Sequence, residues 1–133
     1  MKKLLLLLFI PLLFTCSSDS DDDNEQSYPT IRVVNGSIEH NKKIRGFEVS
    51  GFEIEGLDLL VGESAEYELL DGVSTSPTPV TVTFACGSAG LHDVTNPAIT
   101  FSNGQTTIVT LRHLACDGSS TGTFCNNNCL TQD

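Results

Sequence analysis

The chain of 133 residues has no tryptophan, only two tyrosines and few basic residues. Seven lysines and arginines stand against 17 acidic residues, which gives a formal net charge of −10. Beyond Lys3 only five basic residues remain, and they form no stripe along the sequence. Because phosphate backbones are bound by clustered lysine and arginine, this composition argues against a nucleic-acid partner.

Long hydrophobic runs are also missing. The longest, Leu4 to Phe14, has eleven residues and is interrupted only by Pro11, whereas crossing the hydrocarbon core of a bilayer takes about 20. It follows Lys2 and Lys3 and has the length of the apolar region of a secretory signal peptide, usually about 7–15 residues. Residues 1–15 are therefore predicted to be a targeting segment.

The four residues Leu13-Phe14-Thr15-Cys16 resemble the lipobox of bacterial lipoproteins, in which the cysteine becomes the lipidated first residue of the mature protein. The serine- and aspartate-rich run after Cys16 resembles the surface-export signal of lipoproteins from the Bacteroidota. This resemblance implies a cleaved leader and acyl chains on Cys16. It also implies attachment to the bacterial outer membrane, with the protein exposed at the cell surface.

Residues 16–27 are predicted to be an acidic, disordered tether, because polar residues and uncompensated charge cannot bury enough apolar surface to fold. A calcium loop at Asp19–Asp23 is the alternative, but its glycine and the glutamate at the twelfth position are missing. Removal of the leader takes away Lys2 and Lys3, so the formal charge becomes −12.

Residues 28–117 show no helical periodicity over three turns. Short β-rich runs recur instead, separated by turn residues at the spacing typical of a sandwich or barrel. The fold class predicted is all-β, a small immunoglobulin- or fibronectin-like β-sandwich of six or seven strands, although the tryptophan typical of immunoglobulin domains is absent. The expected strands are Thr30–Asn35, Ile44–Ile54, Ser64–Leu70, Val80–Cys86, Ala98–Phe101 and Thr106–Leu114, with Leu57–Val61 ambiguous.

Two glycines mark turns or irregularities within this pattern. The alternation of apolar residues slips by one at Gly51, which indicates either a β-bulge or a turn between two short strands. Asn103-Gly104 lies between the last two apolar runs and predicts a β-hairpin that joins them.

Once Cys16 is assigned to lipid, four cysteines remain, and export through an oxidising compartment favours two disulfides. Four cysteines allow three pairings. The preferred one is Cys86–Cys116 with Cys125–Cys129, because Cys86 and Cys116 each close an expected strand and the predicted hairpin would bring those ends together. The glycine-, serine- and asparagine-rich residues 118–133 are then a stapled tail. The alternative is a Cys₃His metal site formed by His113, Cys116, Cys125 and Cys129, whose spacing is that of zinc ligands.

Catalytic motifs are absent: there is no Gly-x-Ser-x-Gly, no His-Glu-x-x-His and no phosphate-binding glycine loop. The carboxylate pairs Glu53/Glu55 and Glu66/Glu68 would share one face of a strand, about 6.5–7 Å apart, a separation that suits glycoside hydrolysis. Alternating apolar neighbours explain them more simply as solvated strand faces. His92-Asp93 is interpreted as a solvated loop.

The sequence thus predicts a non-enzymatic, lipid-anchored domain without a cofactor. Its partners are expected to be membrane lipid, through the acyl anchor at Cys16, and a protein or a glycan. A structural or accessory subunit of an envelope complex is the alternative, and a metal-binding protein is a third.

Overall fold

The structure, a computed structural model, describes residues 27–38, 42–70, 73, 76–87, 90–112 and 129–133. The leader, most of the tether, Cys16, Cys116 and Cys125 lie outside these residues. The described part contains eight strands and no helix. They are β1 (Thr30–Asn35), β2 (Lys42–Val49), β3 (Phe52–Leu59), β4 (Ser64–Glu68), β5 (Thr78–Cys86), β6 (Leu91–Ile99), β7 (Thr106–Leu111) and β8 (Leu130–Gln132).

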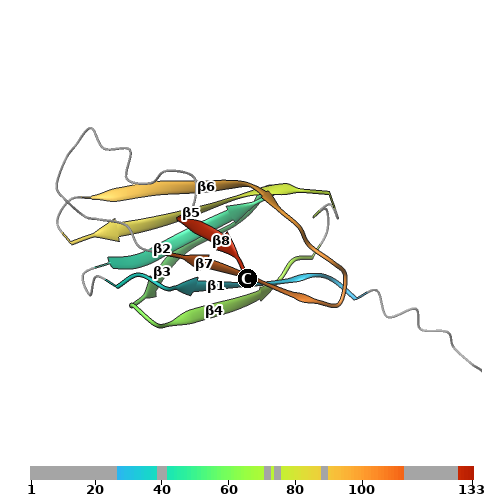
Figure 1. Cartoon of the computed structure of the whole chain (residues 1–133), viewed down its shortest axis with the longest axis horizontal. Coiled ribbons are helices and arrows are strands. Elements are labelled where there is room, and N and C mark those ends of the chain that lie inside the picture. The colour runs from blue at the N-terminus through green and yellow to red at the C-terminus, as the bar shows by residue number, and fades with distance from the viewer. Residues whose placement is uncertain (1–26, 39–41, 71–72, 74–75, 88–89, 113–128) are drawn as a thin grey trace, which may run out of the picture.

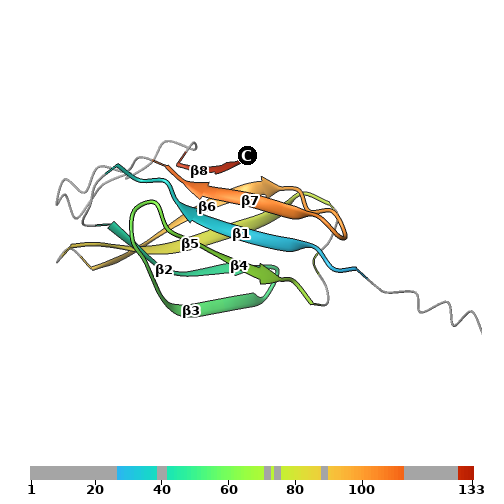
Figure 2. The same cartoon turned by 90° about the horizontal axis from the view of Figure 1, so that it is seen from below.

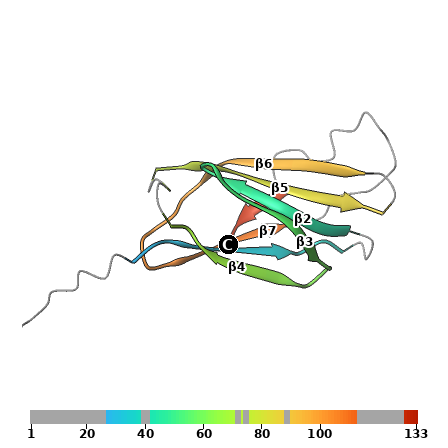
Figure 3. The same cartoon turned by 180° about the vertical axis from the view of Figure 1, so that it is seen from behind.

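The strands form two four-stranded sheets that pack face to face (Figure 1). Sheet A has the order β4-β1-β7-β8, which Figure 2 shows from below. Sheet B has the order β3-β2-β5-β6, which is clearest from behind in Figure 3. All neighbouring strands are antiparallel except β1 and β7, which are parallel. The all-β sandwich predicted from the sequence is confirmed.

The strand order differs from that of immunoglobulin constant domains. In those domains the first and second strands lie in the same sheet, whereas here β1 and β2 lie in different sheets. The immunoglobulin-like detail of the prediction is therefore not confirmed. Strand lengths and turn spacing are common to many sandwiches, so they identify the class but not the order of the strands.

Alternating side chains from both sheets fill the space between them, as expected for sheets that bury one face each. In β5 every second residue from Thr78 to Cys86 is buried, while the residues between them are more accessible. The largest part of the core comes from β1, β2, β5 and β7, with Ile31, Val33, Ile44, Phe47, Val49, Val80, Val82, Phe84, Val109 and Leu111 all nearly inaccessible.

The slip in alternation at Gly51 is a turn. Ser50 and Gly51 both have positive φ, 50° and 82°, and they join β2 to β3 as a two-residue hairpin loop. Positive φ at both positions gives the twist that matches two antiparallel strands. The irregularity in this hairpin lies further along, where the register shifts between Ile44 and Gly46.

The hairpin predicted at Asn103-Gly104 is wrong. The turn itself is present, with the Gln105 amide donating to the Ser102 carbonyl at 3.1 Å, but β6 belongs to sheet B and β7 to sheet A. The chain crosses between the sheets here because Ile99 and Phe101 are both buried in the core. The turn at Asn103-Gly104 sets where the chain reverses, but the burial of Ile99 and Phe101 determines that β7 joins the other sheet.

The loop predicted at His92-Asp93 is also wrong, since both residues lie in β6. This strand is polar and contains Pro97, so its sequence shows no apolar alternation. Such a composition is tolerated at the edge of a sheet, where proline costs no ladder hydrogen bond. Similarly, β8 lies in the stretch that the sequence assigned to a tail, and it pairs with β7. The sandwich therefore continues to Gln132.

The buried side chain of Asn35 links the two sheets. Its Nδ2 donates to the carbonyl of Lys42 in β2 at 3.1 Å and to that of Leu59 in β3 at 3.0 Å. Its Oδ1 accepts from the Ser37 amide at 3.3 Å, and its backbone amide donates to the Glu63 carbonyl at 3.0 Å. Asn35 is completely inaccessible, so every one of these bonds replaces a bond to water.

We predict that Asn35→Ala lowers the free energy of unfolding by about 2–4 kcal/mol, because buried carbonyls lose their donor. Chemical denaturation measures this loss. The control is Asn103→Ala, since Asn103 is exposed and its side chain makes no hydrogen bond among the described residues. A loss at Asn35 no larger than at Asn103 would contradict the role of Asn35.

The carboxylate of Asp133 ties β8 to the end of β7. It accepts hydrogen bonds from the Thr110 hydroxyl at 2.6 Å and from the Arg112 guanidinium at 2.5 Å. The Thr110 hydroxyl and then the Arg112 guanidinium hold the pKa of Asp133 below its usual 3.8. Because both Arg112 and Asp133 are well exposed, the stabilisation is screened by solvent and is small.

A lowered pKa in the folded state means that this contact stabilises the fold above the unfolded pKa near 3.8 and is lost as pH falls through the folded value. We therefore expect Asp133→Asn to lower the melting temperature at neutral pH, with the gap to the unchanged chain closing in acid. Thermal melts between pH 7 and about pH 2 measure it. A gap that is constant across this range would contradict the assignment.

Candidate functional site

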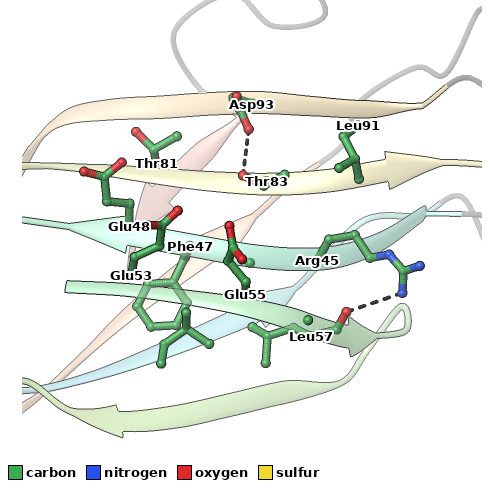
Figure 4. A pocket seen from close by; sticks show the side chains of 13 residues that line it. Arg45, Phe47, Glu48, Glu53, Glu55, Leu57, Thr81, Thr83, Leu91 and Asp93 are labelled. Atoms are coloured by element: carbon green, nitrogen blue, oxygen red, sulfur yellow. Dashed lines mark hydrogen bonds between the residues drawn. The ribbon is translucent and has the colours of Figure 1, made fainter. Parts of the chain in front are cut away.

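The outer face of sheet B is hollowed into an open groove of about 820 Å³. Residues from all four strands of the sheet line it. They are Arg45, Gly46, Phe47, Glu48, Glu53, Ile54, Glu55, Gly56, Leu57, Thr81, Thr83, Leu91 and Asp93. Because all four strands contribute lining residues, the groove crosses the full width of the sheet. Figure 4 shows the residues that line the groove: the side chains of Glu48, Glu53 and Asp93 stand on the outer face, whereas that of Phe47 points into the core.

Three glutamates gather at the β2–β3 side of the groove (Figure 4). Glu48 of β2 lies directly opposite Glu53 of β3, and Glu55 follows two residues along the same strand. Directly opposite residues in an antiparallel pair have Cβ atoms about 4.5–5.5 Å apart, and like charges there are destabilising. Asp93 of β6 adds a fourth carboxylate on the far side of the groove.

The cations of the described chain are committed elsewhere. Lys43 and Arg45 both pair with Asp58 at the end of β3, Lys43 at 3.1 Å. On sheet A, Arg32 pairs with Glu66 and Arg112 pairs with Asp133. Lys42 is fully buried. No ion pair therefore joins Glu48, Glu53 or Glu55 to any residue that the structure describes.

Gly46 forms the floor of the groove between Glu55 and Thr83, which lie opposite it on the two neighbouring strands. A Cβ at this position would come within 2.5 Å of the Ile54 carbonyl oxygen, a distance that excludes any side chain. The close approach of β3 at the register shift thus requires glycine here. As a result, no side chain stands between Glu55 and Thr83 at this position.

The β5–β6 side of the groove consists of fixed hydroxyl groups. Thr81 and Thr95 are hydrogen-bonded across the strands at 2.8 Å, and the Thr83 hydroxyl donates to Asp93 at 2.7 Å. Leu91, with 65% of its surface exposed, stands at the end of this side. The groove thus has an acidic side and a hydroxyl side.

The two predicted carboxylate pairs have different surroundings. Glu53 and Glu55 lie in the groove together with Glu48. Glu66 and Glu68 lie on β4 of the other sheet, where Arg32 binds Glu66 at 2.5 Å. Sequence reasoning missed the position of Glu48 opposite Glu53. The signal for that position was the two-residue turn at Ser50-Gly51, which sets the register of β2 against β3.

The predicted cysteine sites are described only in part. Cys86 and Cys129 are both disulfide-bonded and both belong to the core, whereas Cys16, Cys116, Cys125 and His113 lie outside the described residues. The pairing Cys86–Cys116 with Cys125–Cys129 stays a prediction. The alternative Cys₃His site lies outside the described residues except for Cys129, and it too stays a hypothesis.

Cys86 and Cys129 lie at the same end of the sandwich. Cys86 lies opposite Lys42, whose carbonyl binds Asn35, and Asn35 lies beside Leu111 at the end of β7. The Arg112 amide donates to the Cys129 carbonyl at 2.6 Å. Both cysteines thus lie at the end of the sandwich where β7 ends and β8 begins.

Within the described residues, no three histidine, cysteine, aspartate or glutamate side chains are arranged to hold a metal ion. No helix of this part of the chain is long and apolar enough to cross a bilayer.

Fold and groove together define a β-sandwich with one open, acidic sheet face. No family model matches the chain, and no curated protein or solved structure matches it significantly. The residues themselves therefore carry the functional argument.

We predict that Glu53→Gln raises the free energy of unfolding by about 0.2–1 kcal/mol, because the change removes the repulsion from Glu48 and keeps the shape of the side chain. Denaturant titration at low salt gives the difference. Glu68→Gln is the matched control, since Glu68 is exposed on β4 and lies opposite Thr30 rather than another acid. A gain of equal size at Glu68 would show that only the net charge matters.

Proposed function

We propose that the protein is a lipid-anchored lipoprotein of the bacterial outer membrane, exposed at the cell surface, whose sandwich is a non-catalytic binding domain. The observation that carries the binding role is the groove on sheet B, in which no cation among the described residues pairs with any of the three glutamates.

The lining of the groove favours binding over catalysis. Among the described residues that line it there is no histidine, cysteine, serine or lysine, so of the common nucleophiles and bases only carboxylates and threonine are present. The threonine hydroxyls on its β5–β6 side are already hydrogen-bonded to Thr95 and Asp93. These features suit a surface that holds a partner.

The position of the chain entry supports an anchored domain. The chain enters β1 at one end of the sandwich, and β5 ends toward the other (Figure 1). The tether from Cys16 to Ser27 has twelve residues and spans at most about 40 Å when fully extended. The strands extend between these two ends, so the groove on the face of sheet B lies along the side of the domain and not at either end.

We expect Cys16→Ser to release the protein from membranes or to leave an unprocessed precursor, because the acylated sulfur is gone and one apolar leader of eleven residues does not span a bilayer. Fractionation and the mass of the N-terminal peptide measure this. Ser20→Ala is the control, since it changes the same segment but leaves the cysteine. Unchanged processing and membrane retention of Cys16→Ser would refute the anchor.

A further inference from the structure

We propose that Asn103 is a site of spontaneous deamidation, which converts this residue to aspartate or isoaspartate when the start of β1 opens. The inference goes beyond the proposed function and is independent of it, because it needs neither the anchor nor the groove. It starts from a comparison within one chain. Two asparagines are followed by glycine, Asn35 and Asn103, and glycine obstructs this reaction least because it has no side chain.

Deamidation joins the asparagine side chain to the backbone nitrogen of the next residue. At Asn103 the amide nitrogen of Gly104 loses its proton to hydroxide and attacks Cγ. The bond between Cγ and Nδ2 then breaks, and Nδ2 takes a proton from water and leaves as ammonia, so the product is a cyclic succinimide. Water opens this ring at either carbonyl carbon. Cleavage of the bond from Cγ to the nitrogen gives aspartate, and cleavage of the bond from the main-chain carbonyl carbon gives isoaspartate.

The fold protects Asn35 from this reaction. Its side chain is completely inaccessible, and its Nδ2 donates to the carbonyls of Lys42 at 3.1 Å and Leu59 at 3.0 Å. Ammonia cannot leave until both bonds break. The attacking nitrogen is enclosed as well, since a Cβ at Gly36 would come within 2.6 Å of Cγ2 of Thr110. Reaction at Asn35 therefore requires the two sheets to separate, which is close to global unfolding.

Asn103 lies in the loop between β6 and β7, beside the start of β1 (Figure 2). Its side chain is exposed and makes no hydrogen bond among the described residues. The attacking nitrogen, that of Gly104, donates to the Tyr28 carbonyl at 3.1 Å. Because Tyr28 precedes β1, this bond breaks when the first residues of the sandwich fray, while the core stays intact.

Two further contacts make the loop and residues 27–30 open together. The Thr30 amide donates to the Gln105 carbonyl at 3.0 Å. Ser27 lies so close to Gly104 that a Cβ there would be 3.1 Å from its Oγ. Fraying of residues 27–30 therefore releases the nitrogen of Gly104, whereas the bonds of Asn35 at the other end of β1 remain.

The products change the same loop. Aspartate adds a negative charge at an exposed position, and isoaspartate also inserts a methylene group into the backbone. The inserted group displaces Gly104 and Gln105 from their partners Tyr28 and Thr30. The isoaspartate form therefore keeps the start of β1 open.

The test follows both asparagines in the full chain, purified in detergent and kept at mildly alkaline pH in buffer or in guanidinium chloride. Peptide mapping by mass spectrometry at successive times gives the rate at each residue. In buffer we expect Asn103 to react more than about tenfold faster than Asn35, since local opening costs less free energy than global unfolding. In guanidinium chloride the ratio should fall below about threefold, because no folded structure then protects either residue.

A smaller ratio in buffer would overturn the proposal, because the fold would then not separate the two sites. A ratio that does not fall this far in guanidinium chloride would also overturn it, since the local sequence and not the fold would then set the rates. So would an unreacted Asn103 in buffer after the denatured chain has reacted completely.

Thr30→Pro tests the link to the start of β1, because proline removes the amide that donates to Gln105. We expect Asn103 to react about threefold to tenfold faster in this variant, the effect of one lost hydrogen bond, with Asn35 unchanged. Thr30→Ala is the matched control, since it keeps the amide and should leave both rates unchanged. Equal acceleration at both asparagines, or none at Asn103, would contradict the link.

Discussion

The amide of Asn35 joins strands from both sheets at the end of the sandwich that lies away from the chain entry. A two-sheet fold must close its ends, where strands stop and the backbone groups of the turns have no ladder partner. Here one side chain binds the last carbonyl of β3 and the first of β2, and its own backbone binds the turn at Gly62 and Glu63. The alignment of the two sheets, and with it the depth of the core, depends on this residue.

The alignment also determines the groove. Because Asn35 fixes Leu59 relative to Lys42, β3 must fit three residues between Glu55 and Leu59 where β2 has one between Gly46 and Ile44. The extra length is taken up at Gly56, which has a φ of 74°, and the close approach of β3 leaves room only for glycine at position 46. The irregularity is therefore the reason that no side chain stands at position 46, and in the same segment Arg45 binds the Leu57 carbonyl and Asp58 rather than the glutamates.

Much of this fold follows from the sequence, but its pairings do not. The alternation in Val80–Cys86 and around Phe47 and Val49 correctly predicts strands and their buried sides. The polar strand β6 and the short strand β8 have no such alternation. They are held by pairing with β5 and β7 and by the side chain of Gln132, which accepts a hydrogen bond from the Thr100 amide and donates one to the Thr100 carbonyl. The sequence did not predict the position of Glu48 opposite Glu53 for a related reason. That position depends on whether Gly51 forms a bulge or a turn, and both produce the same slip in alternation.

The acid groups of sheet B also affect self-association. Glu48, Glu53 and Glu55 give this face the same sign in every copy of the chain, so two copies that approached through it would repel each other over about a Debye length, 8–10 Å in physiological salt. Within one copy, the repulsion between Glu48 and Glu53 costs a little stability.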